Sequence, residues 1–414
     1  MNPTSTAPNR DRVIIYSAAF LRALATGMIA VLIGIHLAKL RFDPGTIGTV
    51  VAAGLAGATA AALLVTVAGD RIGRRRALVG LGILGALGGL AVALAAKPYV
   101  LALAAFFGML NGMGRDRGAS MILDQVVLPA TTTDDRRTYA FAYYNVVQDI
   151  GHALGSLLAG LPLLVRRFVP MAEGDSLRLA VGFYAVLLLA TAALYSTLSP
   201  RVEPAAQKEK ARISPETRRI VTRISALFAL DGLGGGFLTT AMLSLFFYTR
   251  FHVDEGVVGA LFFGARAMNA LSHVGAAWLA RRIGLVNTMV FTHIPSSLLL
   301  VTVPFAPSFL VAAILFLLRE GLVEMDVPTR QSYVMAVVRP EERTFASGVT
   351  HIVRLGSWAA APAFAGLFMR TASLAAPLWI GAAMKITYDV LLFSAFRSIR
   401  PPEEVAGSAL SVTK

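Results

Sequence analysis

Ionisable and amide side chains interrupt the long apolar stretches of this 414-residue sequence, and these side chains could do chemistry. A charged group at the centre of a bilayer costs at least about 2.5 kcal/mol on insertion scales, so each one is a candidate for binding a proton, an ion or a charged solute. The candidates for substrate and proton binding are Arg22, Asn111, Arg115, Asp116, Asn145, Asp149, His152, Asp231, Glu320, Glu324 and Arg354.

Arg22 and Asp231 carry opposite charges in two apolar stretches that resemble each other. Overlaying the second half of the chain on the first aligns Asp231 with Ala23, the neighbour of Arg22. If the halves are structural repeats, the two side chains lie at similar depth on opposite walls of one cavity. There they either pair directly or take turns holding substrate or a proton. The alternative is a fixed ion pair that only orients helices.

Charged residues are dense in the stretch 99–126, which is predicted to be one helix. Arg115 and Asp116 fall near its middle. Arg117 lies seven residues before Asp124, a spacing that puts both on nearly the same helical face.

A similar density of charge occurs in the stretch 308–336. Glu320 and Glu324 are one helical turn apart, so like-charge repulsion and loss of water both favour proton uptake by one of them. Pro328 breaks the helix nearby and frees carbonyl groups that need polar partners. The alternative is that neighbouring arginines neutralise both acids.

One polar stripe runs along the stretch 138–165. Asn145, Gln148, Asp149 and His152 follow a spacing of i, i+3, i+4 and i+7, which gathers them on one side of an otherwise apolar helix. Because a histidine titrates near neutral pH, His152 is a candidate proton carrier. A hydrogen-bonded packing role is the alternative.

Metal, thiol and nucleotide chemistry are not expected. The sequence contains no Cys and no pair of His with metal-ligand spacing, and we find no phosphate-binding Gly-x-x-x-x-Gly-Lys-Ser/Thr loop. Nearby arginines would also repel a metal cation. We therefore expect no cofactor, no enzymatic activity and no direct drive by ATP.

The elements that position these residues are predicted to be membrane-spanning helices. Hydrophobic residues make up 56% of the chain and charged residues 15%, with a mean hydropathy of +0.66, which is far from a soluble composition. A span needs about 20 apolar residues. We expect twelve spans, at 13–38, 47–69, 77–96, 99–126, 138–165, 178–198, 219–249, 256–280, 286–305, 308–336, 345–369 and 374–396.

Four of these spans look less suited to chemistry. The spans 77–96, 178–198 and 286–305 carry no Asp, Glu, Lys or Arg in their interiors, which is typical of helices that face lipid. The last span has only Lys385 and Asp389, an i,i+4 pair that can partly neutralise itself.

The distribution of basic residues predicts the orientation. The net charge is +14, and Lys and Arg concentrate in alternate loops, which places both termini in the cytoplasm. The net positive charge is thus explained by membrane topology, and we expect no nucleic-acid partner. The first span lacks a cleavage site, so no removable signal peptide is predicted.

The chain is predicted to consist of two related halves. Residues 199–218 form a charged, proline-containing stretch that we interpret as a cytoplasmic linker between bundles at 1–198 and 219–414. Three pairs of segments match in order at nearly one offset, which indicates that six helices were duplicated in parallel orientation. The pairs are 17–27 with 225–235, 71–73 with 282–284, and 137–140 with 343–346.

The loop 69–76 resembles the signature Gly-x-x-x-Asp-Arg-x-Gly-Arg-Arg of the major facilitator superfamily, although Thr66 replaces the first Gly. The resemblance implies an all-α membrane protein with twelve transmembrane helices in two pseudo-symmetric six-helix bundles. It also implies a conformational latch, in which the loop pairs with an acid of the fourth span. The alternative is a loop that only sets topology. The latch residues would be Asp70, Arg71, Gly73, Arg74 and Asp124.

The function implied is secondary active transport by alternating access across the cytoplasmic membrane. Among its modes we favour proton-coupled efflux of a small organic compound. Proton-coupled uptake of an organic anion and a transport-dead receptor are the alternatives. The expected partners are a small-molecule substrate, protons and the lipid bilayer, and the chain is expected to act as a monomer.

Overall fold

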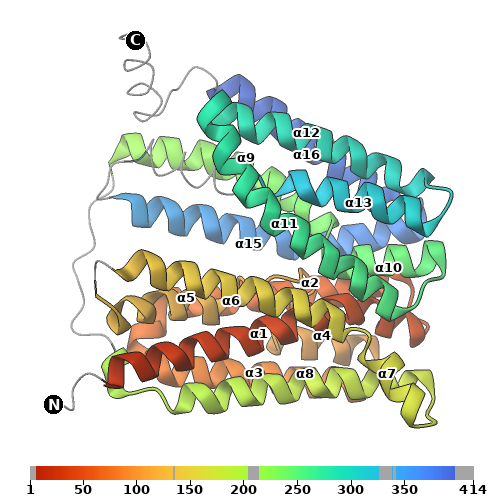
Figure 1. Cartoon of the computed structure of the whole chain (residues 1–414), viewed down its shortest axis with the longest axis horizontal. Coiled ribbons are helices and arrows are strands. Elements are labelled where there is room, and N and C mark those ends of the chain that lie inside the picture. Colours follow the sequence, from red (N-terminus) through yellow and green to blue (C-terminus); the bar gives the residue numbers. More distant parts are fainter. Residues whose placement is uncertain (1–5, 134–135, 204–213, 326–337, 339–341, 397–414) are drawn as a thin grey trace. The chain divides into compact units, whose positions relative to one another are not determined.

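The computed structural model describes residues 6–133, 136–203, 214–325, 338 and 342–396, and all regular structure in this part of the chain is helical (Figure 1). The helices are α1 Thr6–Lys39, α2 Pro44–Ile72, α3 Arg74–Leu94, α4 Pro98–Phe107, α5 Ala119–Val127, α6 Arg137–Leu158, α7 Leu161–Phe168, α8 Glu173–Ser196, α9 Pro215–Phe237, α10 Thr240–Phe251, α11 Glu255–Ile283, α12 Leu285–Thr302, α13 Phe309–Val323, α15 Arg343–Thr371 and α16 Ala376–Phe396. Short 3-10 helices occur at η1 Leu128–Thr131, η3 Pro200–Val202 and η4 Val303–Phe305.

Every predicted span contains helix, which confirms the all-helical membrane fold. Among the described residues, eight helices are long and apolar enough to cross a membrane, and nine if α6 and α7, which meet at a 43° bend, form one span. The spans predicted at 99–126, 256–280 and 308–336 contain helices that do not meet this standard. The number twelve is thus supported only in part.

The predicted helix 99–126 is broken in two. Residues 108–118 between α4 and α5 are not helical, so the prediction that Arg117 and Asp124 share a helical face is wrong. This segment contains Gly108, Gly112, Gly114 and Gly118, and Gly is a poor helix former. The break places Arg115 and Asp116 on irregular backbone, whose polar groups need partners from other elements.

The chain divides into two compact units. The first unit consists of residues 1–208, 238–263 and 359–374, and the second of residues 209–237, 264–358 and 375–414. Helices α11 and α15 each contribute residues to both units. The division into bundles 1–198 and 219–414 with a linker at 199–218 stays a prediction.

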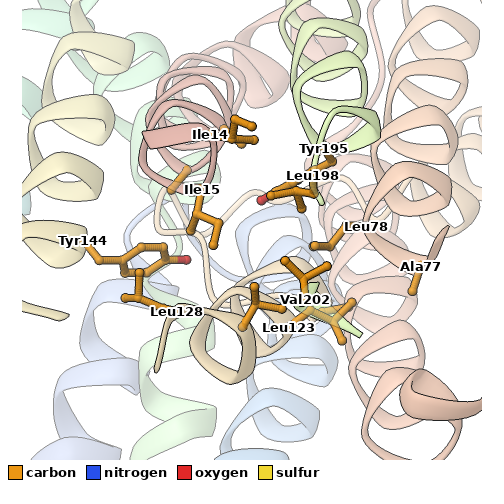
Figure 2. Close-up of a cluster of buried hydrophobic side chains, with 14 of the residues drawn as sticks. Ile14, Ile15, Ala77, Leu78, Leu123, Leu128, Tyr144, Tyr195, Leu198 and Val202 are labelled. Carbon is orange, nitrogen blue, oxygen red and sulfur yellow. The ribbon is translucent and has the colours of Figure 1, made fainter. Parts of the chain in front are cut away.

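A buried apolar cluster lies in the first unit (Figure 2). Ile15 of α1, Leu78 of α3 and Leu123 of α5 contribute to it, together with Tyr144 and Tyr195. The two tyrosines have no exposed surface. Because each carries a hydroxyl group at the end of an apolar ring, they connect this core to the polar site described below.

Helix α1 packs closely on α6. A methyl group at Gly155 of α6 would lie 2.2 Å from the carbonyl oxygen of Leu24, and one at Gly27 of α1 would lie 2.3 Å from that of His152. Only glycine permits this approach of two helical backbones. The contact holds His152 beside the part of α1 that carries Arg22.

The second unit has a core of its own. Val221 and Phe228 of α9, Met289 of α12, and Tyr388 and Leu392 of α16 are buried in it. Helix α16 packs against both α9 and α12 at this core. They also carry four buried titratable residues of the second unit, Asp231, His293, Lys385 and Asp389.

Candidate functional site

A buried polar site in the first unit is centred on Arg22 of α1, whose exposed fraction is 7%. Its guanidinium group donates to Asp116, to Asp124 at 2.9 Å and to the hydroxyl groups of Tyr195 and Tyr144, the last at 3.3 Å. We call this site the Arg22 cluster, which consists of Arg22, Asp116, Asp124, Tyr144, Gln148, His152 and Tyr195.

Asp124 is the most enclosed acid of the Arg22 cluster and has no exposed surface. The hydroxyl groups of Tyr144 and Tyr195 lie 3.0 Å and 2.9 Å from its carboxylate oxygens, so they can donate to it. The cluster thus sets two carboxylates against one guanidinium. A proton on either carboxylate would balance the charge within the cluster.

The cluster also supports the break in the fourth span. The backbone N–H of Asp116 donates to Nε2 of His152 at 2.8 Å. Asn111 donates to the carbonyl oxygen of Arg115 at 2.7 Å and accepts from the backbone N–H of Met113 at 2.9 Å. These side chains replace helical hydrogen bonds that the break has removed. Asn111 and His152 therefore have structural roles here, whatever else they do.

A cavity of about 70 Å³ adjoins the cluster in the first unit. Arg22, Asn111 and Asp116 line it with hydroxyl groups from Ser120 and Tyr195. This volume suits water molecules, since pockets for drug-sized ligands start at about 300 Å³. The Arg22 cluster therefore adjoins a space large enough for water.

The second unit holds a connected row of buried charges. Lys385 of α16 donates to Asp231 of α9 at 3.0 Å, and Arg354 of α15 donates to the other oxygen of Asp231 at 3.3 Å. His293 of α12 lies 3.3 Å from Lys385 and 3.0 Å from Asp389. We call these five residues the Asp231 cluster.

The hydrogen bonds of the Asp231 cluster fix the state of its histidine. A lysine ammonium group can only donate, so Nε2 of His293 accepts from Lys385. Nδ1 therefore carries the ring proton and donates it to Asp389. The row thus links the carboxylates of Asp231 and Asp389 through Lys385 and His293.

Arg354 is the most accessible charged member of the Asp231 cluster. Its side chain is 17% exposed, against 3% for Asp231 and 10% for Lys385. The guanidinium carbon lies 4.8 Å from the ring centroid of Trp358, a cation–π contact that orients it.

The structure brings together some of the predicted residues. Arg22, Asp116 and His152 meet in the first unit, and Asp231 and Arg354 meet in the second. The direct pairing of Arg22 with Asp231 stays a prediction, because the two belong to different units.

The predicted polar stripe of α6 is divided. Gln148 and His152 are buried, and Gln148 donates to Asp116 at 3.4 Å. Asn145 and Asp149 are exposed. The spacing therefore placed all four residues on α6, but only two of them join the Arg22 cluster.

The predicted acids of the tenth span lie at the end of α13. Glu320 is buried and paired with its neighbour Arg319. Glu324 is half-buried at the C-cap of α13. Arg115 is half-buried in the break of the fourth span. The proton-binding roles of these residues stay predictions.

The sequence interpretation missed His293, Tyr144 and Tyr195. The absence of Asp, Glu, Lys and Arg from the range of α12 predicts a lipid-facing helix, yet His293 is 1% exposed and bonded on both ring nitrogens. A histidine in an apolar stretch carries the same signal as an acid and would have identified this helix. Lys385 and Asp389, whose spacing predicts a pair that partly neutralises itself, each also bond a side chain on another helix.

Glu203 is a partner of the predicted latch loop among the described residues. Gly73 adopts φ +93°, and the Glu203 carboxylate accepts from the backbone N–H of Arg74 at 2.7 Å and of Arg75 at 3.2 Å. Arg71 is exposed, and the side chain of Asp70 lies outside the described residues. Asp124 instead bonds the Arg22 cluster, so the latch stays a prediction.

Comparisons with known proteins place the chain in a family. The Major Facilitator Superfamily profile matches residues 15–362. The uncharacterized membrane protein YJR124C of Saccharomyces cerevisiae is 24% identical, over 94% of this chain and 95% of that protein. The nucleoside transporter NupG has a similar fold, with a TM-score of 0.74 and 14% identity over 93% of this chain and 99% of that one. An inward-facing bacterial homologue of the human lysosomal transporter Spinster has a TM-score of 0.70 and 14% identity, over 95% and 96% of the two chains.

The match covers most of the chain, and the fold agrees with it. The chain is a multi-pass membrane transporter and belongs to the major facilitator superfamily.

Proposed function

We propose that the protein is a proton-coupled secondary transporter of a small organic anion. Asp231 would be the proton acceptor, and Arg354 and Lys385 would bind the anion. The observation that carries this proposal is that two cations hold one buried carboxylate, at 3.3 Å and 3.0 Å.

The coupling follows from the charge of Asp231. When its carboxylate is ionised, it compensates Arg354 and Lys385 and competes with any anionic solute for them. When it takes up a proton, both cations lose that partner in a buried place, where an uncompensated charge is costly. A solute carboxylate or phosphate then binds them favourably. The proton and the anion therefore bind together and cross in the same direction.

The pH gradient would supply the work, because a proton and a singly charged anion that cross together move no net charge. Under an inward gradient this mechanism gives uptake, which is the anion alternative of the sequence interpretation.

Efflux in exchange for protons is the second candidate, and the Arg22 cluster supports it. Two carboxylates there face one guanidinium group, and Asp116 lines the adjoining cavity. A proton and a cationic compound would compete for such an acid. Competition, unlike joint binding, couples the two movements in opposite directions.

The test uses the full-length protein in liposomes. A thermal-shift screen of small carboxylates, phosphates and organic cations first identifies a ligand, since a specific ligand stabilises the folded state. Flux of that ligand is then measured under an imposed pH gradient. We expect an anion to accumulate on the alkaline side in the wild type. Asp231→Asn should abolish this accumulation and spare exchange of labelled for unlabelled ligand.

Asp175→Asn is the matched control, because Asp175 is 60% exposed and pairs only locally with Arg178 among the described residues. The control should accumulate ligand as the wild type does. Unchanged accumulation in Asp231→Asn would remove Asp231 from coupling. Movement of a cation against the proton flow would favour efflux, and saturable binding without exchange would indicate a receptor.

A further inference from the structure

A groove in the first unit lies between the start of α2, the start of α4 and the end of α15. Its volume is about 450 Å³. It lies at the end of α2 opposite the Gly73 loop, and thus at the opposite face of the membrane. Neither the Arg22 cluster nor the Asp231 cluster contributes a residue to it.

Polarity changes along this groove from one end to the other. Thr46 and Arg370 lie near the helix ends, since α2 begins at Pro44 and α15 ends at Thr371. Val50 lies about 6 Å further along α2 than Thr46, at 1.5 Å per residue, and it is apolar. Ala102 of α4 also lines the groove and lies deeper than Pro98, the first residue of its helix.

Aromatic side chains border the groove on two helices. Tyr99 of α4 is 62% exposed and Phe364 of α15 is 52% exposed. Large exposed aromatic groups on a membrane-spanning chain face the bilayer, and a tyrosine close to a helix end is typical of the lipid–water boundary. The groove therefore opens toward lipid.

Arg370 offers hydrogen-bond donors at the polar end. It donates to Asp43 at 3.4 Å, and its side chain is 54% exposed. Asp43 already accepts from the backbone N–H of Gly45 and from the backbone N–H and hydroxyl group of Thr46. The part of the chain that the structure describes gives Arg370 no second hydrogen bond. A guanidinium group has five N–H donors in a planar fork, and this geometry matches a phosphate group.

The charge around the polar end is positive. Arg41 precedes Asp43 by two residues, and Lys97 precedes the first residue of α4; both are exposed. Together with Arg370 they outnumber Asp43, the acid that pairs with Arg370. A ligand with negative charge is therefore favoured over one that is neutral overall.

We infer that this groove is a binding site for an anionic phospholipid. The phosphate binds Arg370 at the end of α15, and an acyl chain lies along Val50, Ala102 and Phe364. This assignment follows from the single direction of the polarity change, which matches a head group followed by a tail. It does not depend on which solute the protein transports.

The experiment measures lipid binding to the full-length protein. The protein is placed in phosphatidylcholine nanodiscs, and the phosphatidylglycerol that it retains is counted by native mass spectrometry as the phosphatidylglycerol fraction rises. We expect Arg370→Gln to weaken retention about tenfold, the loss of one charge-assisted hydrogen bond. Ala102→Phe should weaken it too, by filling the apolar end while leaving Arg370 in place.

Arg178→Gln is the matched control, because Arg178 lies near the start of α8 at the same membrane face and does not line the groove. It should retain phosphatidylglycerol as the wild type does. Equal retention of phosphatidylglycerol and phosphatidylcholine, or unchanged retention in Arg370→Gln, would overturn the assignment. Displacement of the lipid by millimolar inorganic phosphate would also overturn the assignment, since the site would then recognise the phosphate group without an acyl chain.

Discussion

At the scale of single residues, Arg22 is the group on which the polar core of the first unit depends. Its guanidinium group compensates two carboxylates, and Asp124 also lies within hydrogen-bond distance of two tyrosine hydroxyl groups. Asp124 can lose its charge without leaving Arg22 unpaired, because Asp116 stays in place. Removing Arg22 leaves both acids buried without their cation.

This difference gives a prediction about stability. Arg22→Gln should lower the free energy of unfolding by about 3–5 kcal/mol, the cost of breaking a buried ion pair. Asp124→Asn should lower it by about 1–3 kcal/mol, because only hydrogen bonds to a charged group are weakened. Thermal and denaturant unfolding of the purified protein measures both changes.

The same pair of variants tests the latch expected from the sequence. If Asp124 acts only as a latch for the loop 69–76, Asp124→Asn would unfold like the wild type and would merely slow transport. Asp70→Asn is the comparison, since it alters the loop side of that latch. It should slow turnover more than it weakens ligand affinity.

At the scale of elements, α3 begins with an unusual cap. The carboxylate of Glu203 follows η3 and accepts from the first two backbone N–H groups of α3, at 2.7 Å and 3.2 Å. Helix starts favour negative charge and need acceptors for these groups. The segment that leaves the first unit is thereby tied to the loop at Gly73.

We expect Glu203→Ala to destabilise the start of α3 by about 1 kcal/mol, which is typical of a lost helix cap. Hydrogen exchange should show faster exchange of the amides of Arg74 and Arg75, with little change in the middle of α3. Glu203→Gln keeps an acceptor oxygen and should change the exchange less. Equal exchange in all three proteins would mean that water caps the helix as well as Glu203 does.

The elements also show what sequence reasoning can find. Long apolar stretches located helices in every predicted range, because some 20 neighbouring residues decide each span together. The break at 108–118 was missed because its glycines lie within an apolar context, where they lower helix propensity only modestly. His293 was missed because a count of charges alone ignored neutral titratable groups.

Partners of buried groups were harder to predict than positions. The sequence selected Arg22, Asp116 and Asp231 because a buried charge is costly wherever it lies. It did not indicate that Lys385 would bond Asp231, since that contact joins α9 with α16 and depends on packing. An i,i+4 spacing shows which side chains can meet on one helix, but a buried group takes the partner that packing brings nearest.

At the scale of the whole molecule, the first unit joins parts of the chain that are distant in sequence. Residues 238–263 and 359–374 come from the second half of the chain and are grouped with residues 1–208. Hydrogen bonds to the backbone connect these distant segments. The N–H of Ala241 donates to the carbonyl oxygen of Gly112 at 3.0 Å, and the Thr240 hydroxyl group donates to that of Met113 at 2.9 Å.

Ala241→Pro tests this join, because proline removes the N–H donor and is tolerated in the first turn of a helix, where Ala241 lies in α10. We expect the variant to fold and to exchange ligand at an altered rate, with the equilibrium between transport states displaced. Ala241→Ser keeps the donor and should behave as the wild type does. Identical exchange rates in all three proteins would show that this hydrogen bond does not affect the transport cycle.

The bond between Gly112 and Ala241 also has a consequence for mutational surveys. A substitution that changes only the side chain keeps the peptide groups that form this hydrogen bond. A library of such substitutions would therefore report only how large a side chain each position accepts. Their contribution to transport would pass unseen unless the library included proline or replaced an amide by an ester. Tolerance of side-chain substitution at these positions is therefore poor evidence that they have no role in transport.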